Sequence, residues 1–249
     1  MKRVLYDGRF EITLREVLFS IIIIAVFVGV GSLVSEKITS YIDENNQSVE
    51  QALKINNDAA LFEYAMRTNA GDAFVSGTLA AVDTVSMPDI EGNYAGIAVD
   101  TERYTRHTRE VRHEKDGKVW YTEEEYWIWD LIDSEEINCN KIKFLEHEFE
   151  YGQIGFPAKE YLTTIKCGYH LRNKYYVNEV SYNGVIRTKL KDNTITKTNL
   201  MSGLSVEEAV NRSLSNTDIV SVIFWMVWIC FTAFVTYMFF VGENKWIED

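Results

Sequence analysis

Two uncharged apolar stretches decide the architecture: VLFSIIIIAVFVGVGSLV, residues 17–34, and IVSVIFWMVWICFTAFVTYMFFV, residues 219–241. The first has 18 residues and the second has 23. A helix rises about 1.5 Å per residue, so runs near 20 residues match a hydrocarbon core of roughly 30 Å. The sequence therefore predicts two transmembrane helices, with the lipid bilayer as a partner and a soluble domain between them.

The distribution of charge predicts the orientation of these helices. The chain carries a formal net charge of −12, and most of the acidic residues lie between the two apolar stretches. Lys2, Arg3, Arg9 and Arg15 precede the first stretch, and positive charge is enriched on the cytoplasmic side of a span. We expect both termini to be cytoplasmic and the central domain to be extracytoplasmic or luminal. The first stretch exceeds the usual signal-peptide core and lacks a small-residue cleavage site, so we interpret it as a signal anchor.

The segment between the spans changes from helical to β-like periodicity. The predicted fold class is an α+β membrane protein, in which two transmembrane helices flank a β-rich extracytoplasmic domain with a helical stalk. An interruption is expected near residues 43–46 of the stalk, and Ser205-Val-Glu-Glu208 is a capping box that predicts a short helix. The expected parts are a cytoplasmic N-terminus (1–16), a first transmembrane helix (17–34), the stalk (35–71), the β-rich domain (72–203), a connecting helix (204–216), a second transmembrane helix (217–241) and a cytoplasmic tail (242–249).

Turn-forming dipeptides predict the hairpins of the β-rich domain. Asp116-Gly117 favours a two-residue type I′ turn between strands 97–113 and 119–132. In that register Arg109 faces Glu124, Arg103 faces Asp130, Arg106 faces Trp127 and Tyr104 faces Trp129, which are favourable cross-strand pairs. Asn183-Gly184 predicts a second β-hairpin, joining 174–182 to 185–191, and Asp192-Asn193 a further turn.

Part of this domain resembles a known family. Phe74-Val-Ser-Gly77-Thr-Leu, the segment from Asp100 to Glu110, and Trp120-Tyr-Thr with Glu125-Tyr-Trp127 resemble the luminal domain of the LUMA (transmembrane protein 43) family. A more distant likeness is to the membrane-adjacent β-domain of GIDE-type mitochondrial ubiquitin ligases. The likeness covers residues 72–160, about a third of the chain. It implies a small β-domain beside a membrane that serves protein association or sensing. LUMA proteins have further C-terminal spans, whereas one follows the domain here, and the RING of the ligases is absent.

Motifs for enzymatic and metal chemistry are missing from the sequence. His147-Glu148 begins like the zinc-protease helix motif, but Tyr151 stands where the second histidine is required. No phosphate loop, nucleophile elbow or dinucleotide fingerprint occurs. The acidic composition argues against nucleic-acid binding. We therefore expect no catalytic residue, no metal, no cofactor and no nucleic-acid partner. A membrane-tethered hydrolase remains an alternative, based on Glu123, Glu124 and Glu125.

The densest aromatic cluster outside the apolar stretches suggests an interaction surface. Trp127 and Trp129 fall on one face of their strand, and Tyr126 and Ile128 on the other, so one apolar face must meet another layer, a partner or lipid. Packing in the core is the alternative explanation. The residues of this candidate interaction surface are Trp120, Tyr121, Trp127, Trp129, Arg106 and Arg109.

Two further groups of residues suggest structural roles. Cys139 and Cys167 form a possible disulfide if the compartment is oxidising. Small residues in the apolar stretches favour helix packing, either between the two spans or in a homo-oligomer. These span-packing residues are Ala25, Gly29, Gly31, Thr232 and Thr236.

The leading functional hypothesis is a non-enzymatic, membrane-anchored binding or scaffold module that presents the β-rich domain for protein association or sensing. Its partner would be another protein or a second copy of the chain. A receptor-like input module that acts through a separate signalling partner is the first alternative.

Overall fold

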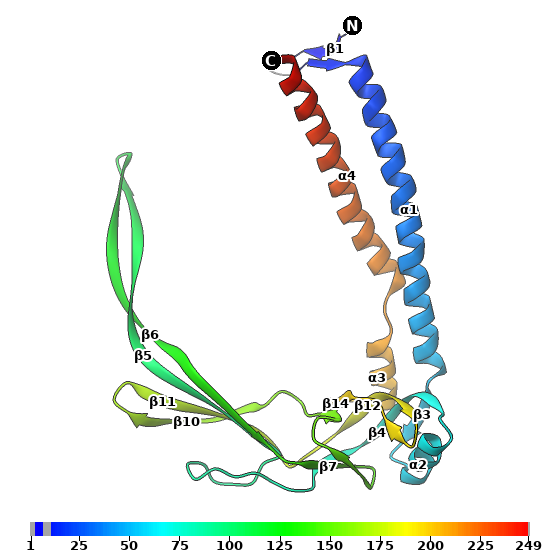
Figure 1. The fold of residues 1–249 in the computed structure, drawn as a ribbon, viewed down its shortest axis with the longest axis vertical. Helices are drawn as coiled ribbons and strands as arrows, with labels where there is room; N and C mark the ends of the chain where they lie inside the picture. The colour runs from blue at the N-terminus through cyan, green and yellow to red at the C-terminus, as the bar shows by residue number, and fades with distance from the viewer. Residues whose placement is uncertain (1–2, 7–10, 249) are drawn as a thin grey trace. The chain divides into compact units, whose positions relative to one another are not determined.

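The computed structural model describes the backbone of residues 3–6 and 11–248 and the side chains of residues 14–242. The fold is α+β, with a β-rich body and a long apolar helix near each end of the chain (Figure 1). It divides into two compact units, which are described separately. The helical unit comprises Met1–Gln51 and Asn211–Asp249, and the β-rich unit comprises Ala52–Val210.

The helical unit is built on α1 (Leu14–Gln51) and α4 (Thr217–Glu248), which pack against each other. The short strands β1 (Arg3–Tyr6) and β2 (Glu11–Thr13) pair antiparallel before α1. The expected interruption near residues 43–46 is wrong, because α1 continues through it. Asn46 exchanges two hydrogen bonds of 2.9 Å with the backbone of Ser215, and the Thr217 hydroxyl donates to Asp43 at 3.1 Å. These partners hold the polar turn of α1 against the start of α4.

Trp228 makes the central contact of the helix pair. Its indole N–H donates to the Phe27 carbonyl at 2.9 Å, and the Phe27 ring also lies 5.7 Å from Phe231. A Cβ on Gly31 would collide with the Trp228 indole, so glycine is needed there for the helices to approach. Gly29, by contrast, has open space around it. The structure therefore uses Gly31, and not Gly29, for packing between the two helices of one chain.

The remaining predicted span-packing residues have other roles. Ala25 is exposed. The Thr232 hydroxyl donates to the Trp228 carbonyl and the Thr236 hydroxyl to the Thr232 carbonyl, both at 2.8 Å along their own helix. The two threonines also line an apolar groove of about 270 Å³ with residues of α1 and α4. They therefore border the helix pair without bonding across it.

The larger sheet of the β-rich unit has the order β8-β7-β4-β12-β14-β9, with β3 beside β4 and β13 beside β12. Helix α2 (Ala59–Arg67) packs on it, where Phe62 meets Phe144 in the buried core. The strands are β3 (Leu53–Asn56), β4 (Gly71–Ala81), β7 (Lys141–Phe144), β8 (His147–Glu150), β9 (Ile154–Gly155), β12 (Ser181–Lys191), β13 (Thr194–Ile195) and β14 (Thr198–Ser202).

The predicted stalk is helical only in part. α1 ends at Gln51, and Leu53–Asn56 then forms β3, which pairs in parallel with β4 so that Ile55 lies opposite Val75. Asp58 caps α2 by accepting a hydrogen bond from the Leu61 N–H at 2.9 Å. The C-terminal part of the predicted stalk therefore belongs to the core of the β-rich unit.

The predicted hairpin at Asn183-Gly184 is also wrong. Both residues lie inside β12, which pairs with β4 on one side and β14 on the other. The chain turns instead between Asn178 and Ser181. A Cβ on Gly184 would lie 2.5 Å from the Met201 carbonyl oxygen, so this glycine permits close approach of two backbones.

Two other local predictions are confirmed. Asp192 and Asn193 both have positive φ, 55° and 59°, and join β12 to β13. Helix α3 (Val206–Ser213) begins with the predicted capping box. The Ser205 N–H donates to Glu208 at 2.8 Å, and the Glu208 N–H donates to the Ser205 hydroxyl at 3.3 Å.

The smaller sheet has four strands in the order β10-β11-β5-β6. Its strands are β5 (Gly96–Lys115), β6 (Lys118–Asn138), β10 (Glu160–Gly168) and β11 (Leu171–Asn178). At the base of the sheet, Ile97, Val99, Tyr175 and Val177 form a small core with Ile90. The Tyr175 hydroxyl donates to Asp89 at 2.9 Å, which fixes the covering segment. One face of the base is thereby buried.

Candidate interaction surface

The hairpin of β5 and β6 is the most exposed part of the smaller sheet. Asp116 and Gly117 both have positive φ, 51° and 72°, as the predicted type I′ turn requires. Arg109 pairs with Glu124, and Tyr104 with Trp129, so the predicted register is confirmed. β11 pairs with β5 only as far as Arg103. Beyond that point β5 and β6 pair with each other alone (Figure 1). We call residues 104–129 the ribbon.

One face of the ribbon, called the aromatic face here, carries stacked aromatic side chains. The Tyr104 ring lies 5.2 Å from the Trp127 ring and 5.1 Å from the Trp129 ring. The His170 ring meets the Tyr104 and Trp127 rings edge-on, at 5.5 and 5.6 Å. Tyr169 stacks in turn on His170 at 4.0 Å and is 89% exposed. The result is a continuous aromatic strip, in which Trp127 and Tyr169 are exposed and the other rings are half-buried.

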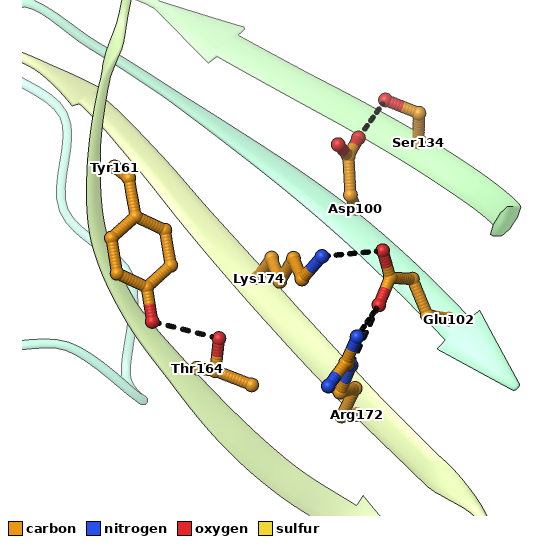
Figure 2. A network of polar contacts seen from close by, with 7 residues as sticks. All are labelled: Asp100, Glu102, Ser134, Tyr161, Thr164, Arg172 and Lys174. Atoms are coloured by element: carbon orange, nitrogen blue, oxygen red, sulfur yellow. Dashed lines mark hydrogen bonds and ion pairs between the residues drawn. The ribbon is translucent and has the colours of Figure 1, made fainter. Parts of the chain in front are cut away.

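A charged cluster adjoins this strip at the base of the sheet. The Arg172 guanidinium lies 4.0 Å from the Trp129 ring centre and donates to Glu102 at 2.6 Å. Lys174 donates to the other oxygen of Glu102 at 2.8 Å (Figure 2). Burial raises the pKa of Glu102, but the hydrogen bonds from Lys174 and Arg172 outweigh it and leave the pKa below its ordinary value. Glu102 is therefore an ionised anchor for two cations.

Two further hydrogen bonds border the charged cluster. The Ser134 hydroxyl donates to Asp100 at 2.7 Å, between β6 and β5. The Tyr161 and Thr164 hydroxyls lie 2.9 Å apart on β10. Figure 2 shows Asp100 on the same strand as Glu102, Ser134 on the neighbouring β6, and the Tyr161–Thr164 pair on β10, beyond β11. Sequence patterns indicate none of this network, because β11 and β5 are joined only by tertiary pairing. Arg172 and Lys174, two residues apart on β11, can be recognised as partners of Glu102 only when the register between β11 and β5 is known.

The opposite face of the ribbon holds two of the six residues predicted for the interaction surface. Trp120 stacks on His113 at 5.4 Å, and Arg109 bonds Glu124 at 2.7 Å. Trp127, Trp129, Tyr121 and Arg106 lie on the aromatic face, because alternate strand residues point to opposite sides. The predicted surface is therefore split, and Trp120 and Arg109 do not belong with the others.

The opposite face also carries a polar contact that the sequence did not indicate. Asp130 accepts from the Thr105 hydroxyl and lies 2.6 Å from the His107 ring nitrogen. Both contacts hold the pKa of Asp130 below its ordinary value, and the hydrogen bond from Thr105 has the larger effect.

The glutamates considered for hydrolysis lie exposed on the ribbon. Glu124 is bonded to Arg109, and Glu125 lies 3.3 Å from Arg106. Glu123 stands opposite Glu110, an unfavourable pairing of like charges. Within residues 14–242, no three His, Cys, Asp or Glu side chains gather as a metal site would require. The positions of the glutamates fit a structural role in the hairpin.

The cysteines are free thiols in the structure. Cys139 is buried in the core of the larger sheet, and burial raises the pKa of its thiol. Cys167 is exposed on β10, where its thiol donates to Asn173 at 3.4 Å. The possible disulfide between them is not formed: Cys139 is buried in the segment between β6 and β7, whereas Cys167 is exposed on β10.

Comparisons with protein-family models, with curated proteins and with solved structures found no match to this chain. The candidate surface therefore rests on its own geometry: an exposed two-stranded ribbon, an aromatic strip and an ionised cluster at its base.

Proposed function

We propose that this chain is a membrane-anchored binding module that presents the ribbon to protein partners. The observation that carries the proposal is the ribbon itself, whose aromatic face leaves Trp127 exposed and Tyr104 and Trp129 only half-buried. An isolated two-stranded hairpin is at best marginally stable in water. Coverage of the aromatic face by another protein would bury this strip and stabilise the ribbon at the same time.

The two apolar helices support anchoring in a bilayer. In the most apolar stretch of α1, 11% of the residues are buried, and in that of the C-terminal helix none are. Leu18, Val26 and Val227 are each more than half exposed. Exposure of apolar surface to water costs about 25 cal/mol per Å², whereas a hydrocarbon environment removes that cost. The helix pair therefore suits lipid on its outer sides. The basic N-terminal residues favour placement of the β-rich unit on the extracytoplasmic or luminal side.

Anchoring is tested by extraction of membranes with alkaline carbonate, followed by flotation in a density gradient. The full chain is expected to float with the lipid. Addition of protease to sealed vesicles of known sidedness then tests the orientation. Recovery in the soluble fraction would contradict anchoring, and protection of the β-rich unit from protease added on the extracytoplasmic side would contradict the orientation.

Binding is tested by photo-crosslinking from two neighbouring positions of the ribbon. Trp127 on the aromatic face and Ile128 on the opposite face are 46% and 41% exposed, so they form a matched pair. With a photoreactive phenylalanine analogue at each position in turn, adducts in native membranes are expected from position 127 and not from position 128. Equal adducts from both positions, or none from either, would contradict a docking role for the aromatic face.

The LUMA-like resemblance remains a prediction, and the membrane-adjacent β-domain that it implies agrees with this proposal. The receptor-like alternative would use the same surface for input and needs a second protein for output. The hydrolase alternative rests on Glu123 and Glu125; both are exposed on the ribbon, where Glu125 pairs with Arg106 and Glu123 stands opposite Glu110.

A further inference from the structure

The ribbon has two free backbone edges. β6 is the last strand of its sheet, and no other strand of the described residues pairs with its outer edge. β5 has a second free edge beyond Tyr104, whose N–H still donates to the His170 carbonyl after the pairing with β11 ends at Arg103. The eleven residues 105–115 span about 36 Å of extended chain. Long unpaired edges are templates for the addition of another strand.

The direction of the free backbone groups follows from a single hydrogen bond. The Tyr104 N–H donates to the His170 carbonyl at 2.9 Å, away from β6. Alternate residues of a strand direct their backbone groups to the same edge, so Arg106 and Arg112 also present theirs outward. The residues opposite these positions on β6, such as Trp127 and Tyr121, present their groups to the other free edge. Each edge therefore offers a regular row of donors and acceptors.

The two edges carry opposite charge. On β5 beyond Tyr104, four Arg and Lys residues stand against two Glu residues. On β6 from Lys118 to Asp130, four acidic residues stand against one Lys. Two β6 edges brought together would place acid against acid, which is unfavourable for directly opposed residues. A β6 edge beside a β5 edge would instead repeat the contacts that join Arg109 to Glu124 within the hairpin.

We propose that the ribbons of neighbouring copies pair edge to edge, with β6 of one copy antiparallel to β5 of the next. The partner is thus a second copy of this chain, which deepens the proposed function and rests on it. Because a different edge is used on each side, the contact is heterologous and can continue from copy to copy or close into a ring. β11 occupies the β5 edge up to Arg103, so the contact is confined to the ribbon.

The experiment uses single cysteines on the two edges of the full chain in liposomes. Val111 and Thr122 face each other within the hairpin, and in the same register they would face each other between copies. Val111→Cys and Thr122→Cys are made in separate chains, with different tags, in a background of Cys167→Ser and Cys230→Ser. Oxidation of the mixture is expected to give a disulfide that joins the two tags. Val111→Cys with Glu124→Cys tests the register shifted by two residues.

The matched control is Val180→Cys, a half-exposed position outside the ribbon, mixed with Val111→Cys. If neither Val111→Cys with Thr122→Cys nor Val111→Cys with Glu124→Cys gave more crosslink between the tags than this control, the proposed pairing would be overturned. A dimer formed by Thr122→Cys alone, in excess of the mixed product, would mean that β6 pairs with β6 and would overturn it as well.

A second variant keeps the result interpretable if a cysteine disturbs the hairpin. Glu123→Pro removes an N–H that points to the outer edge and leaves the bonds to β5 in place. It is expected to reduce the crosslink to the control level, whereas Glu123→Ala, which keeps the N–H, retains it. Persistence of the crosslink in Glu123→Pro would overturn the proposal. Photo-adducts from position 127 with a different protein, in the absence of the disulfide, would overturn self-pairing and leave the proposed binding function standing. The disulfide in a chain that fails to float with lipid would refute anchoring and leave self-pairing standing.

Discussion

Replacement of Glu102 by glutamine is expected to destabilise the β-rich unit by about 2–3 kcal/mol, because charge-assisted hydrogen bonds in sheltered positions contribute about 1.5–3 kcal/mol each. Glu102 accepts such bonds from Arg172 and Lys174 at 2.6 and 2.8 Å. The three side chains are sheltered, with exposures of 13%, 23% and 27%. Glutamine keeps the shape and one acceptor oxygen, but it leaves two cations without a counter-charge.

The matched control is Glu124→Gln. Glu124 accepts from Arg109 at a similar distance of 2.7 Å, but these two side chains are 52% and 61% exposed. An exposed ion pair contributes at most about 1 kcal/mol, because water screens it and ordering of the side chains opposes it. The two substitutions remove the same carboxylate charge from the same hairpin, so their difference isolates the effect of burial.

The assay is thermal or urea unfolding of the full chain in detergent, followed by intrinsic tryptophan fluorescence, in which the three ribbon tryptophans report on the β-rich unit and the three in α4 on the helical unit. For a unit of this size, 1 kcal/mol corresponds to roughly 2–4 °C in Tm, so Glu102→Gln is expected to lower Tm by about 5–10 °C. Glu124→Gln is expected to lower it by less than about 4 °C. Equal shifts for the two variants would refute the argument that shelter from solvent makes the Glu102 cluster strong.

Three other outcomes follow from the same structure. Because folding lowers the pKa of Glu102, its contribution to the free energy of unfolding is complete above the ordinary carboxyl pKa of 4.5 and declines as pH falls below that value. The difference in stability between wild type and Glu102→Gln should therefore shrink in acid unfolding titrations. Gly184→Val places side-chain atoms against the Met201 carbonyl, and should cost about 2 kcal/mol or more in urea unfolding, whereas Gly168→Val, where a Cβ makes only ordinary contact with Leu171, provides the comparison. Gly117→Val forces a β-branched residue into positive φ, and is expected to speed amide exchange at the ribbon tip without changing exchange in the core of the larger sheet.

The features that sequence analysis predicts correctly are those set by neighbouring residues. Asp116-Gly117 forms the expected turn because both positions adopt positive φ, and the register of the whole ribbon then follows from the turn. The capping box at Ser205 and Glu208 is equally local. The two long apolar helices were also predictable, since length and composition suffice to identify them.

The errors arise where distant segments meet. Asn183-Gly184 carries the same turn signal, yet pairing with β4 and β14 holds it extended, and the missing Cβ of Gly184 serves the approach of Met201 instead. The helix break expected near residues 43–46 fails because the 215–217 segment supplies hydrogen bonds to Asp43 and Asn46. No local pattern contains these partners. The Glu102 cluster was unpredictable for the same reason, because its cations come from a strand about 70 residues further along the chain.

The base and the ribbon of the smaller sheet differ in how their two faces are covered, and this difference supports the proposed docking role of the ribbon. At the base, one face packs on Ile90 and is fixed by Tyr175, while the other carries the ionised Glu102 cluster. Both faces therefore stabilise the strands there. Along the ribbon the same strands continue beyond the contacts of Tyr104 and Trp127 with His170, and no third strand of the described residues pairs with them there. Strands that only completed a fold would be expected to end at Arg103, where the neighbouring strand ends. The extension keeps an aromatic strip and two oppositely charged edges accessible, and the proposed docking of a partner would cover the strip and pair the edges.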